Sequence, residues 1–311
     1  MLHRVGAERI AYSFDRRLQP VLEIRSGDEV VFETLDARAG RVMTECDEYV
    51  VRPPQPLERM NPVSGPVGVR GAQGGDTLLV EIEDIRLGAK GYSAVRRDMG
   101  ILKDMVQHPG VTIIGVKEDR ILFNDRISLP TRPMIGTIGV APPSQGVPSA
   151  YPGPHGGNMD CNDVAVGAKV FLPVYAEGAL FALGDVHASM GDAEISGGGL
   201  EIAADVKVKI TLLRHIHLDT LLVETERNII IVHNSKTVEE AIRGVVLKSV
   251  RLLIQRMGLS FEDAYRVAST VGDVRICQAC ASSIDAVVRM RIPKLFGIED
   301  VETVASREKT I

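Results

Sequence analysis

The sequence HGGNMDCND (155–163) opens a segment that continues through LPVYAEGALFALGDVHASMGDAEISGGGLE (172–201), and we expect the fold to be organised around it. Acidic residues and histidines recur between its glycines. They are His155, Asp160, Asp163, Glu177, Asp185, His187, Asp192, Glu194 and Glu201. Carboxylates and imidazoles are ligands of divalent cations, and glycines allow the tight turns that bring ligands together. The segment therefore predicts a divalent metal site, with the rest of the chain as its scaffold.

The composition is that of an ordinary globular protein, with 45% hydrophobic and 25% charged residues in a chain of 311. The formal charge of -5 argues against a nucleic-acid partner, which would usually require a basic stripe. No window approaches ~18 consecutive apolar residues, so we expect no membrane span. The first residues lack the apolar core of a secretory signal, and four scattered cysteines do not form a disulfide framework. We therefore expect a cytoplasmic protein.

Most of the chain has the patterning of β-strands. The run LLVEIEDIRL (78–87) alternates apolar and polar residues, which predicts a strand with one buried face. Further strands are expected at 110–116, 120–124, 134–141, 169–174, 179–185, 204–213, 219–225 and 228–233. A region rich in proline and glycine (52–77) predicts a loop. A second such region (142–157) is long enough to predict a functional loop that leads into the acidic segment.

Helical patterning begins after Lys236. Thr237 and Glu240 have the spacing of a capping box, and Gly258 marks the end of an amphipathic helix. A second helix is expected to begin at Ser260.

Strands followed by late helices predict an α+β fold that is mainly antiparallel β, with a β-sandwich-like core and helices added in the C-terminal part. We expect a single unit over 1–311. A subdivision gives an N-terminal β region (1–141), a metal-site β region (142–235) and a helical C-terminal region (236–311).

Asp185 and His187 are the first candidate ligands within the segment. Residues two apart on an extended chain project to the same side, so this pair can share a cation or act as an acid–base pair. The alternative is a structural hydrogen-bonded pair, but the acids that follow within sixteen residues favour the metal site. Asn158 and Asp160 are also two apart, and an Asx-type turn is the alternative interpretation there.

The two cysteines of CQAC, Cys277 and Cys280, form a single C-x-x-C pair. A zinc ribbon needs a second pair, and no redox context surrounds this one. We interpret both cysteines as small buried side chains.

Several of these motifs resemble the acetamidase/formamidase family. They are HGGNMD, the run from LPV to GALFALGD, GDVHA and GDAE, joined by FETLDARAG (32–40), NPVSGPVGVRGAQGGDTLLVEI (61–82) and VGDVRICQACASSIDAVVRMRIPK (271–294). The resemblance covers nearly the whole chain. It implies a β-sandwich-based fold, a divalent metal, oligomerisation, and hydrolysis of a short-chain amide to carboxylate and ammonia. The matching positions are Asp36, His155, Asn158, Asp160, Asp185, His187, Glu194 and Glu201.

Our hypothesis from the sequence is metal-assisted amide hydrolysis, with Asp160, Asp185 and His187 as metal ligands and Glu194 as the general base. Asp36 is the second catalytic candidate, completing or orienting the ligand shell. His155, Asn158 and Glu201 are candidates for substrate binding or for support of the ligands. We expect zinc first and calcium second as the metal, a small amide as substrate, and a homo-oligomer of two or more subunits. A nucleophilic amidase using Cys161 or a serine, and a non-catalytic protein that binds a metal or small amide, are the alternatives.

Overall fold

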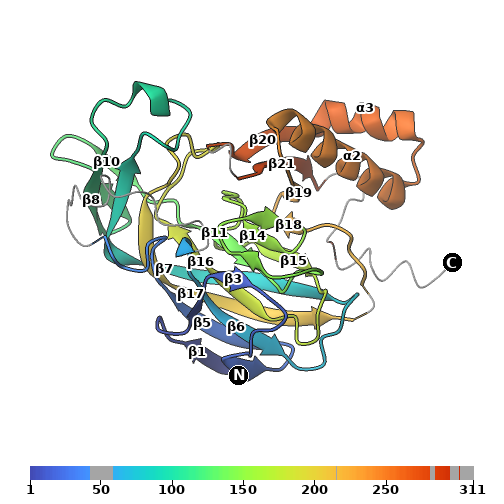
Figure 1. Cartoon of the computed structure of the whole chain (residues 1–311). Coiled ribbons are helices and arrows are strands. Elements are labelled where there is room, and N and C mark those ends of the chain that lie inside the picture. Colours follow the sequence, from blue (N-terminus) through green and yellow to red (C-terminus); the bar gives the residue numbers. More distant parts are fainter. Residues whose placement is uncertain (43–58, 215, 281–283, 295–300, 302–311) are drawn as a thin grey trace.

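The computed structural model describes residues 1–42, 59–214, 216–280, 284–294 and 301. Antiparallel strands dominate it, and its α-helices, α2 (Val238–Met257) and α3 (Phe261–Val271), follow late in the chain (Figure 1). A 3-10 helix, η2, covers Lys103–Met105. The predicted α+β class, mainly antiparallel β with helices added in the C-terminal part, is confirmed.

The strands are given in chain order. They are β1 (Leu2–Val5), β2 (Ile10–Ala11), β3 (Ser13–Phe14), β4 (Leu22–Ile24), β5 (Asp28–Thr34), β6 (Val63–Val69), β7 (Thr77–Val95), β8 (Gly110–Lys117), β9 (Arg120–Leu122), β10 (Ser128–Pro130), β11 (Met134–Gly139), β12 (Val147–Pro148), β13 (Pro152–Gly153), β14 (Gly156–Asn158), β15 (Lys169–Pro173), β16 (Phe181–His187), β17 (Glu201–Leu213), β18 (Leu222–Glu224), β19 (Asn228–Ser235), β20 (Asp273–Gln278) and β21 (Ala286–Pro293).

A large curled sheet forms most of the fold. Its longest strands pair antiparallel, with β17 lying between β5 and β7. Burial alternates strictly along β5, so one face of this strand is directed into the core and the other is partly exposed. A large apolar cluster, which includes Phe32, Ile82, Val170, Phe181 and Val206, fills the inside of the curl. Since the sheet closes around this cluster, it encloses a core much as the two layers of a sandwich do.

Three strands at the centre of the fold are buried on both faces. Every residue of β6, β11 and β16 is buried. β16 pairs antiparallel with β11 on one side and with β6 on the other, and β11 also pairs with β14. Polar side chains on these strands are therefore held in the interior, where they must find partners or ligands.

The predicted loop over 52–77 is wrong in its central part, because residues 63–69 form the buried strand β6. Residues 52–58 lie outside the described part of the chain. The glycine and proline that suggested turns serve the packing of this strand instead. A Cβ on Gly65 would lie 3.0 Å from the Phe181 carbonyl oxygen, so a glycine allows β6 and β16 to approach closely.

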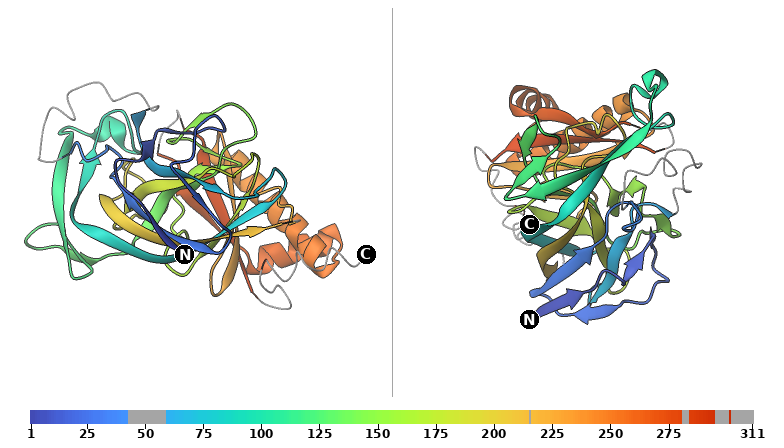
Figure 2. Two further views of the ribbon diagram at one scale, coloured as in Figure 1. Left: turned by 90° about the horizontal axis from the view of Figure 1, so that it is seen from below. Right: turned by 90° about the vertical axis from the view of Figure 1, so that its left-hand side faces the viewer.

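The helices pack against β19 and β21 and enclose a second apolar cluster with Leu253 and Met290. Figures 1 and 2 show them on one side of the molecule, away from the N-terminal strands. The caps are as predicted: the Thr237 side chain accepts a hydrogen bond from the Glu240 amide, and Gly258 ends α2 in the left-handed conformation. Within the described residues, neither helix is both long and apolar enough to cross a membrane.

Replacing Phe181 by alanine tests the core inside the curl. Phe181 is fully buried and meets the Phe32 ring edge-on, with 5.7 Å between ring centroids. We expect Phe181→Ala to lower the free energy of unfolding by about 3–5 kcal/mol, measured by urea denaturation. Phe123→Ala is the matched control, because 41% of Phe123 is exposed, and we expect a change within about 0.5 kcal/mol. Equal losses in the two variants would contradict this description of the core.

Candidate functional site

Neighbouring strands bring the predicted metal ligands together. Asp185 and His187 lie on β16, Asp160 follows β14, and His187 is directly opposite Glu201, the first residue of β17. One ligand atom each from Asp160, Asp185 and His187 lies within 4.8 Å of the others, and the same holds for His187, Glu194 and Glu201. All five side chains are buried, with 1% to 8% exposed. We call these five residues the acid–imidazole cluster.

Several polar atoms of the cluster have no hydrogen-bond partner within the described structure. These atoms are both carboxylate oxygens of Asp160, Asp185 Oδ1, Glu201 Oε2 and both ring nitrogens of His187. His187 Nε2 lies 3.2 Å from Glu201 Oε1, which is an ion-pair distance, but the two atoms do not form a hydrogen bond. Buried polar atoms are nearly always satisfied in native proteins. Their concentration at one point indicates a ligand, and carboxylate oxygens with an imidazole nitrogen suit a divalent cation.

The other oxygen of Asp185 is firmly held. Asn61 Nδ2 donates to Asp185 Oδ2 at 2.6 Å. Thr137 Oγ1 lies 3.1 Å from the same oxygen and 2.9 Å from Asn158 Oδ1, so its single proton serves one of them at a time. These contacts fix the orientation of the carboxylate and leave Oδ1 for a ligand. Supporting hydrogen bonds of this kind are typical of metal sites.

Like charges are crowded in the cluster. Burial and the neighbouring carboxylates of Glu194 and Asp185 raise the pKa of Asp160 well above its usual range. Burial likewise raises the pKa of Glu194 to about 7 and raises the pKa of Glu201. Burial opposes protonation of His187, but the Glu201 and Asp185 carboxylates outweigh it and raise the His187 pKa well above its ordinary value. A bound cation would relieve this repulsion.

The backbone of the cluster is held in an uncommon conformation. Asn61, Asp160, Asp185 and Glu194 all have positive φ, between 47° and 57°. Non-glycine residues adopt this left-handed region rarely, and they cluster at functional sites where the surrounding fold enforces it. Gly136 is required for a different reason: a Cβ there would lie 2.6 Å from Asp160 Oδ1 and 2.9 Å from Asp185 Oδ2.

Glu194 lies in the connection between β16 and β17 and is held by the end of β20. The Ala193 amide is shared between the carbonyl oxygens of Ile276 and Cys277, at 2.9 and 3.0 Å. Cys280 Sγ donates to Glu194 Oε2 at 3.3 Å. The cysteines of CQAC are buried, as their interpretation requires, but Cys280 also contacts the candidate base. The sequence spacing of these cysteines contains no signal of that contact.

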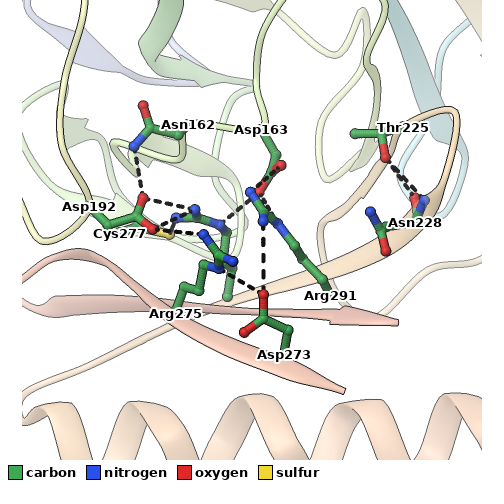
Figure 3. Close-up of polar contacts among 10 residues, drawn as sticks. Asn162, Asp163, Asp192, Thr225, Asn228, Asp273, Arg275, Cys277 and Arg291 are labelled. Carbon is green, nitrogen blue, oxygen red and sulfur yellow. Dashed lines mark hydrogen bonds and ion pairs between the residues drawn. The ribbon is translucent and has the colours of Figure 1, made fainter. Parts of the chain in front are cut away.

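Asp163 and Asp192 form a salt-bridge network with arginines of β20 and β21 (Figure 3). Arg289, which is 1% exposed, lies 2.7 Å from Asp163 and donates to both oxygens of Asp192 at 2.8 and 3.0 Å. Arg291 makes two further hydrogen bonds to Asp163, at 3.0 and 2.8 Å. Asp163 is three residues from Asp160, and Asp192 is two from Glu194. Arg289 therefore ties together the two segments that supply a candidate ligand and the candidate base.

The remaining predicted site residues lie around the cluster. Asp36 Oδ1 accepts hydrogen bonds from the amides of Arg38 and Gly40, at 2.8 and 3.1 Å, and so closes a turn after β5. Burial, together with the charge of Asp185, raises the Asp36 pKa. His155 packs against Phe14, with 5.1 Å between ring centroids, and burial lowers its pKa to about 4. Neither Asp36 nor His155 belongs to the two groups of converging ligand atoms.

A cavity of about 50 Å³ gives access to the cluster. Asn158, Asp185, Glu194 and Glu201 contribute to its wall. Other wall residues were not anticipated from the sequence. They are Arg38, Met60, Tyr92, Met99, Gln278 and Cys280. Because these side chains come from segments far apart in the chain, no local pattern identifies them.

Solved structures share this architecture. The chain is 31% identical to a recombinant predicted acetamidase/formamidase from Thermoanaerobacter tengcongensis, with a TM-score of 0.90 over 94% of this chain and 96% of that one. An acetamidase from Bacillus halodurans is 33% identical, with a TM-score of 0.88 over 94% and 97% of the two chains. A gamma lactamase from Delftia acidovorans, at 21% identity and a TM-score of 0.65, shares the fold over 95% of this chain and 91% of that one.

Sequence comparison is consistent with this relationship. The model of the acetamidase/formamidase family matches residues 7–151 and 144–294, and the chain belongs to that family. Among curated relatives, a formamidase from Methylophilus methylotrophus is 25% identical over 256 residues, 63% of this chain. An acetamidase from Mycolicibacterium smegmatis is 25% identical over 257 residues, 61% of this chain. The matches span 62% and 63% of the lengths of these two relatives.

The substitution Gly136→Ala tests whether the cluster binds a metal. The new methyl group would displace the carboxylates of Asp160 and Asp185 from each other. We expect Zn²⁺ affinity, measured by calorimetric titration, to fall at least about tenfold. Gly110→Ala is the control, because nothing lies within 4 Å of its Cβ position. Unchanged affinity in Gly136→Ala would place the metal elsewhere.

The crowded acids also predict how stability depends on pH. Without metal, the folded chain keeps Glu194 protonated up to a pKa of about 7, whereas the unfolded chain loses this proton above ~4.3. The raised pKa values of Asp160 and Glu201 act in the same direction, and together these three carboxyls outnumber His155, whose lowered pKa acts in the opposite direction. The free energy of unfolding should therefore fall as the pH rises from 5 to 7.

Urea midpoints at pH 5, 6 and 7, with and without Zn²⁺, measure this dependence. Zn²⁺ should flatten the curve, and Glu194→Gln should make the slope of the metal-free protein smaller. Metal-free protein that becomes more stable towards pH 7 would contradict the prediction.

Proposed function

We propose that the protein hydrolyses the C–N bond of a short linear amide, of the formamide or acetamide type, to a carboxylate and ammonia. Membership of the acetamidase/formamidase family supports an amidase, and the relatives named formamidase and acetamidase support small acyl groups. The observation that carries the proposal is the acid–imidazole cluster, whose unsatisfied atoms lie beside a small cavity.

We propose that a divalent ion, zinc first and calcium second, is held by Asp160, Asp185 and His187. Three protein ligands with room for a further one are typical of catalytic zinc sites. Such an ion, when bound, polarises the amide carbonyl and makes water acidic enough to supply a nucleophile near neutral pH. The unsatisfied oxygens of Asp160 and Asp185 fit this role, as does the imidazole of His187.

Glu194 has the position and chemistry of a general base. Its carboxylate belongs to the cluster and also contributes to the cavity wall, where an amide would enter. With a pKa of about 7, it can take a proton from the attacking water and later return it to the leaving nitrogen. Cys280 Sγ, which donates to Oε2, orients the carboxylate and leaves Oε1 for this transfer.

The other candidates support these groups. Glu201 faces His187 across the strand pair and orients its ring. Asn158, through Thr137, belongs to the same hydrogen-bonded group as Asp185 and also lines the cavity, so it can contact the substrate. Asp36 acts through the turn that it closes, because that turn places Arg38 in the cavity wall. His155 directly precedes β14 and packs against Phe14 of β3, so it links these two strands. The predicted homo-oligomer and cytoplasmic location stay predictions.

Cysteine chemistry is less well supported as an alternative. A nucleophilic cysteine needs a lowered pKa and access to the substrate. A hydrogen bond with Cys277 lowers the pKa of the Cys161 thiol, but Cys161 is fully buried and does not line the cavity beside the cluster. Cys280 does line that cavity, but burial raises the pKa of its thiol.

The substitution Glu194→Gln tests the general base. Removing the proton acceptor should reduce kcat at least about 100-fold, while Zn²⁺ affinity should change less than about threefold, because Glu194 is not one of the three proposed ligands. Glu226→Gln, on an exposed connection, is the control and should leave both quantities unchanged. Full activity in Glu194→Gln would remove this residue from the mechanism.

Ammonia release from formamide and acetamide, with and without a chelator, tests the proposed reaction. We expect release that stops after chelation and returns with Zn²⁺, because the proposed ion polarises the amide. Release that survives exhaustive chelation would favour a cysteine or serine nucleophile. Metal binding without release from any of several small amides would favour a non-catalytic binding protein.

A further inference from the structure

A second and larger cavity, of about 530 Å³, lies outside the acid–imidazole cluster. Its wall includes four arginines, Arg132, Arg275, Arg289 and Arg291, and a single carboxylate, Asp192. We call this cavity the arginine groove. Several of its residues appear in Figure 3. Positive charges concentrated in a concave surface attract anions more strongly than the same charges spread over a convex one.

Two of the four arginines are held by protein acids. Arg289 pairs with Asp163 and Asp192, and Arg291 makes two hydrogen bonds to Asp163. Arg289 is 1% exposed, so its guanidinium is a fixed part of the wall. These two residues give the groove a rigid floor and keep Asp192 from acting as a free negative charge.

The other two arginines retain unused donors. Arg132 is exposed, and within the described structure its guanidinium has no hydrogen bond or ion pair. Arg275 donates from Nε to Asp273 Oδ2 at 2.7 Å, and its Nη1 is 3.8 Å from Asp192 Oδ2, beyond hydrogen-bond length. An arginine has five N–H donors in a planar fork that fits a carboxylate or phosphate group. Most of these donors are therefore available on Arg132 and Arg275.

We propose that the arginine groove binds a small molecule bearing a carboxylate or phosphate group, with Arg132 and Arg275 as its recognition residues. The volume is within the range of small-molecule sites. A carboxylate and a phosphate each present a pair of oxygens that can accept two parallel N–H hydrogen bonds from an arginine fork. Pro133, Val166 and Met190 give the groove an apolar part for the remainder of such a molecule.

The groove shares a wall with the loop of the candidate base. Asp192 lines the groove, Ala193 is hydrogen-bonded to β20, and Glu194 belongs to the acid–imidazole cluster. An anion bound to Arg275 would therefore lie next to the loop that carries Glu194 into the proposed active site. The binding itself does not depend on the proposed amidase activity.

Isothermal titration of the full chain with inorganic phosphate and with acetate, each at constant ionic strength set by chloride, tests the proposal. The double variant Arg132→Gln/Arg275→Gln should bind the preferred anion at least about tenfold more weakly. Arg86→Gln/Arg266→Gln is the matched control, because both arginines are exposed and pair with nearby aspartates outside the groove. It should bind within twofold of the unmodified protein.

The two anions distinguish the sources of the ligand. If phosphate binds more tightly than acetate, the ligand is assigned as a phosphate-bearing molecule. If acetate binds more tightly, it is assigned as a carboxylate. The proposal is overturned if Arg132→Gln/Arg275→Gln and the control variant bind the anion with equal affinity. It is also overturned if phosphate and acetate give no more heat of binding than chloride alone. Anion binding at the acid–imidazole cluster would be unchanged in the groove variant, so it is separated by the same comparison. If the double variant does not fold, Arg132→Gln alone decides, since that side chain is exposed.

Discussion

The fold is built around an unfavourable electrostatic arrangement: four carboxylates and an imidazole are buried together at the meeting point of β14, β16 and β17. Burial alone would drive such groups apart or keep them protonated. The surrounding structure prevents separation. The pairing of β16 with β11 fixes the strand that carries Asp185 and His187, and Asn61 and Thr137 hold one carboxylate oxygen of Asp185. The result is a rigid group of buried carboxylates and an imidazole whose arrangement could hold a cation without rearrangement.

Much of the fold could be predicted because the relevant signals are local. Alternation along residues 78–87 and 204–213 corresponds to the long strands β7 and β17, and the capping residues Thr237 and Ser260 mark both helices. β6 was missed because its glycine and proline resemble turn residues, although here they permit close packing of buried strands. In this fold, glycine in a sequence pattern does not distinguish a turn from a crowded strand interior.

The candidate site could be predicted only in part, because only some of its residues are close together in the sequence. Asp185 and His187 are two apart on one strand, so periodicity places them on one side. Cys280 contacts Glu194 and Arg289 contacts Asp163 across long sequence separations. The pairing of β21 with β19 and with β20 sets their positions. Nothing local in CQAC distinguishes a cysteine packed in the core from one that touches a carboxylate. The four arginines of the groove are likewise spread over residues 132–291, and no local pattern predicts that they line one cavity.

The bridge between Ala193 and β20 has a consequence for the order in which the molecule assembles. Asp160, Asp185 and His187 are synthesised well before residues 273–280, which hold the Glu194 loop. The hydrogen bonds from Ala193 to β20 and from Cys280 to Glu194 cannot form until residues 273–280 have been made, whatever the order in which the earlier strands pair. A chain that ends before β20 would therefore lack the contacts that hold the loop of the candidate base, even if every residue of the acid–imidazole cluster were present.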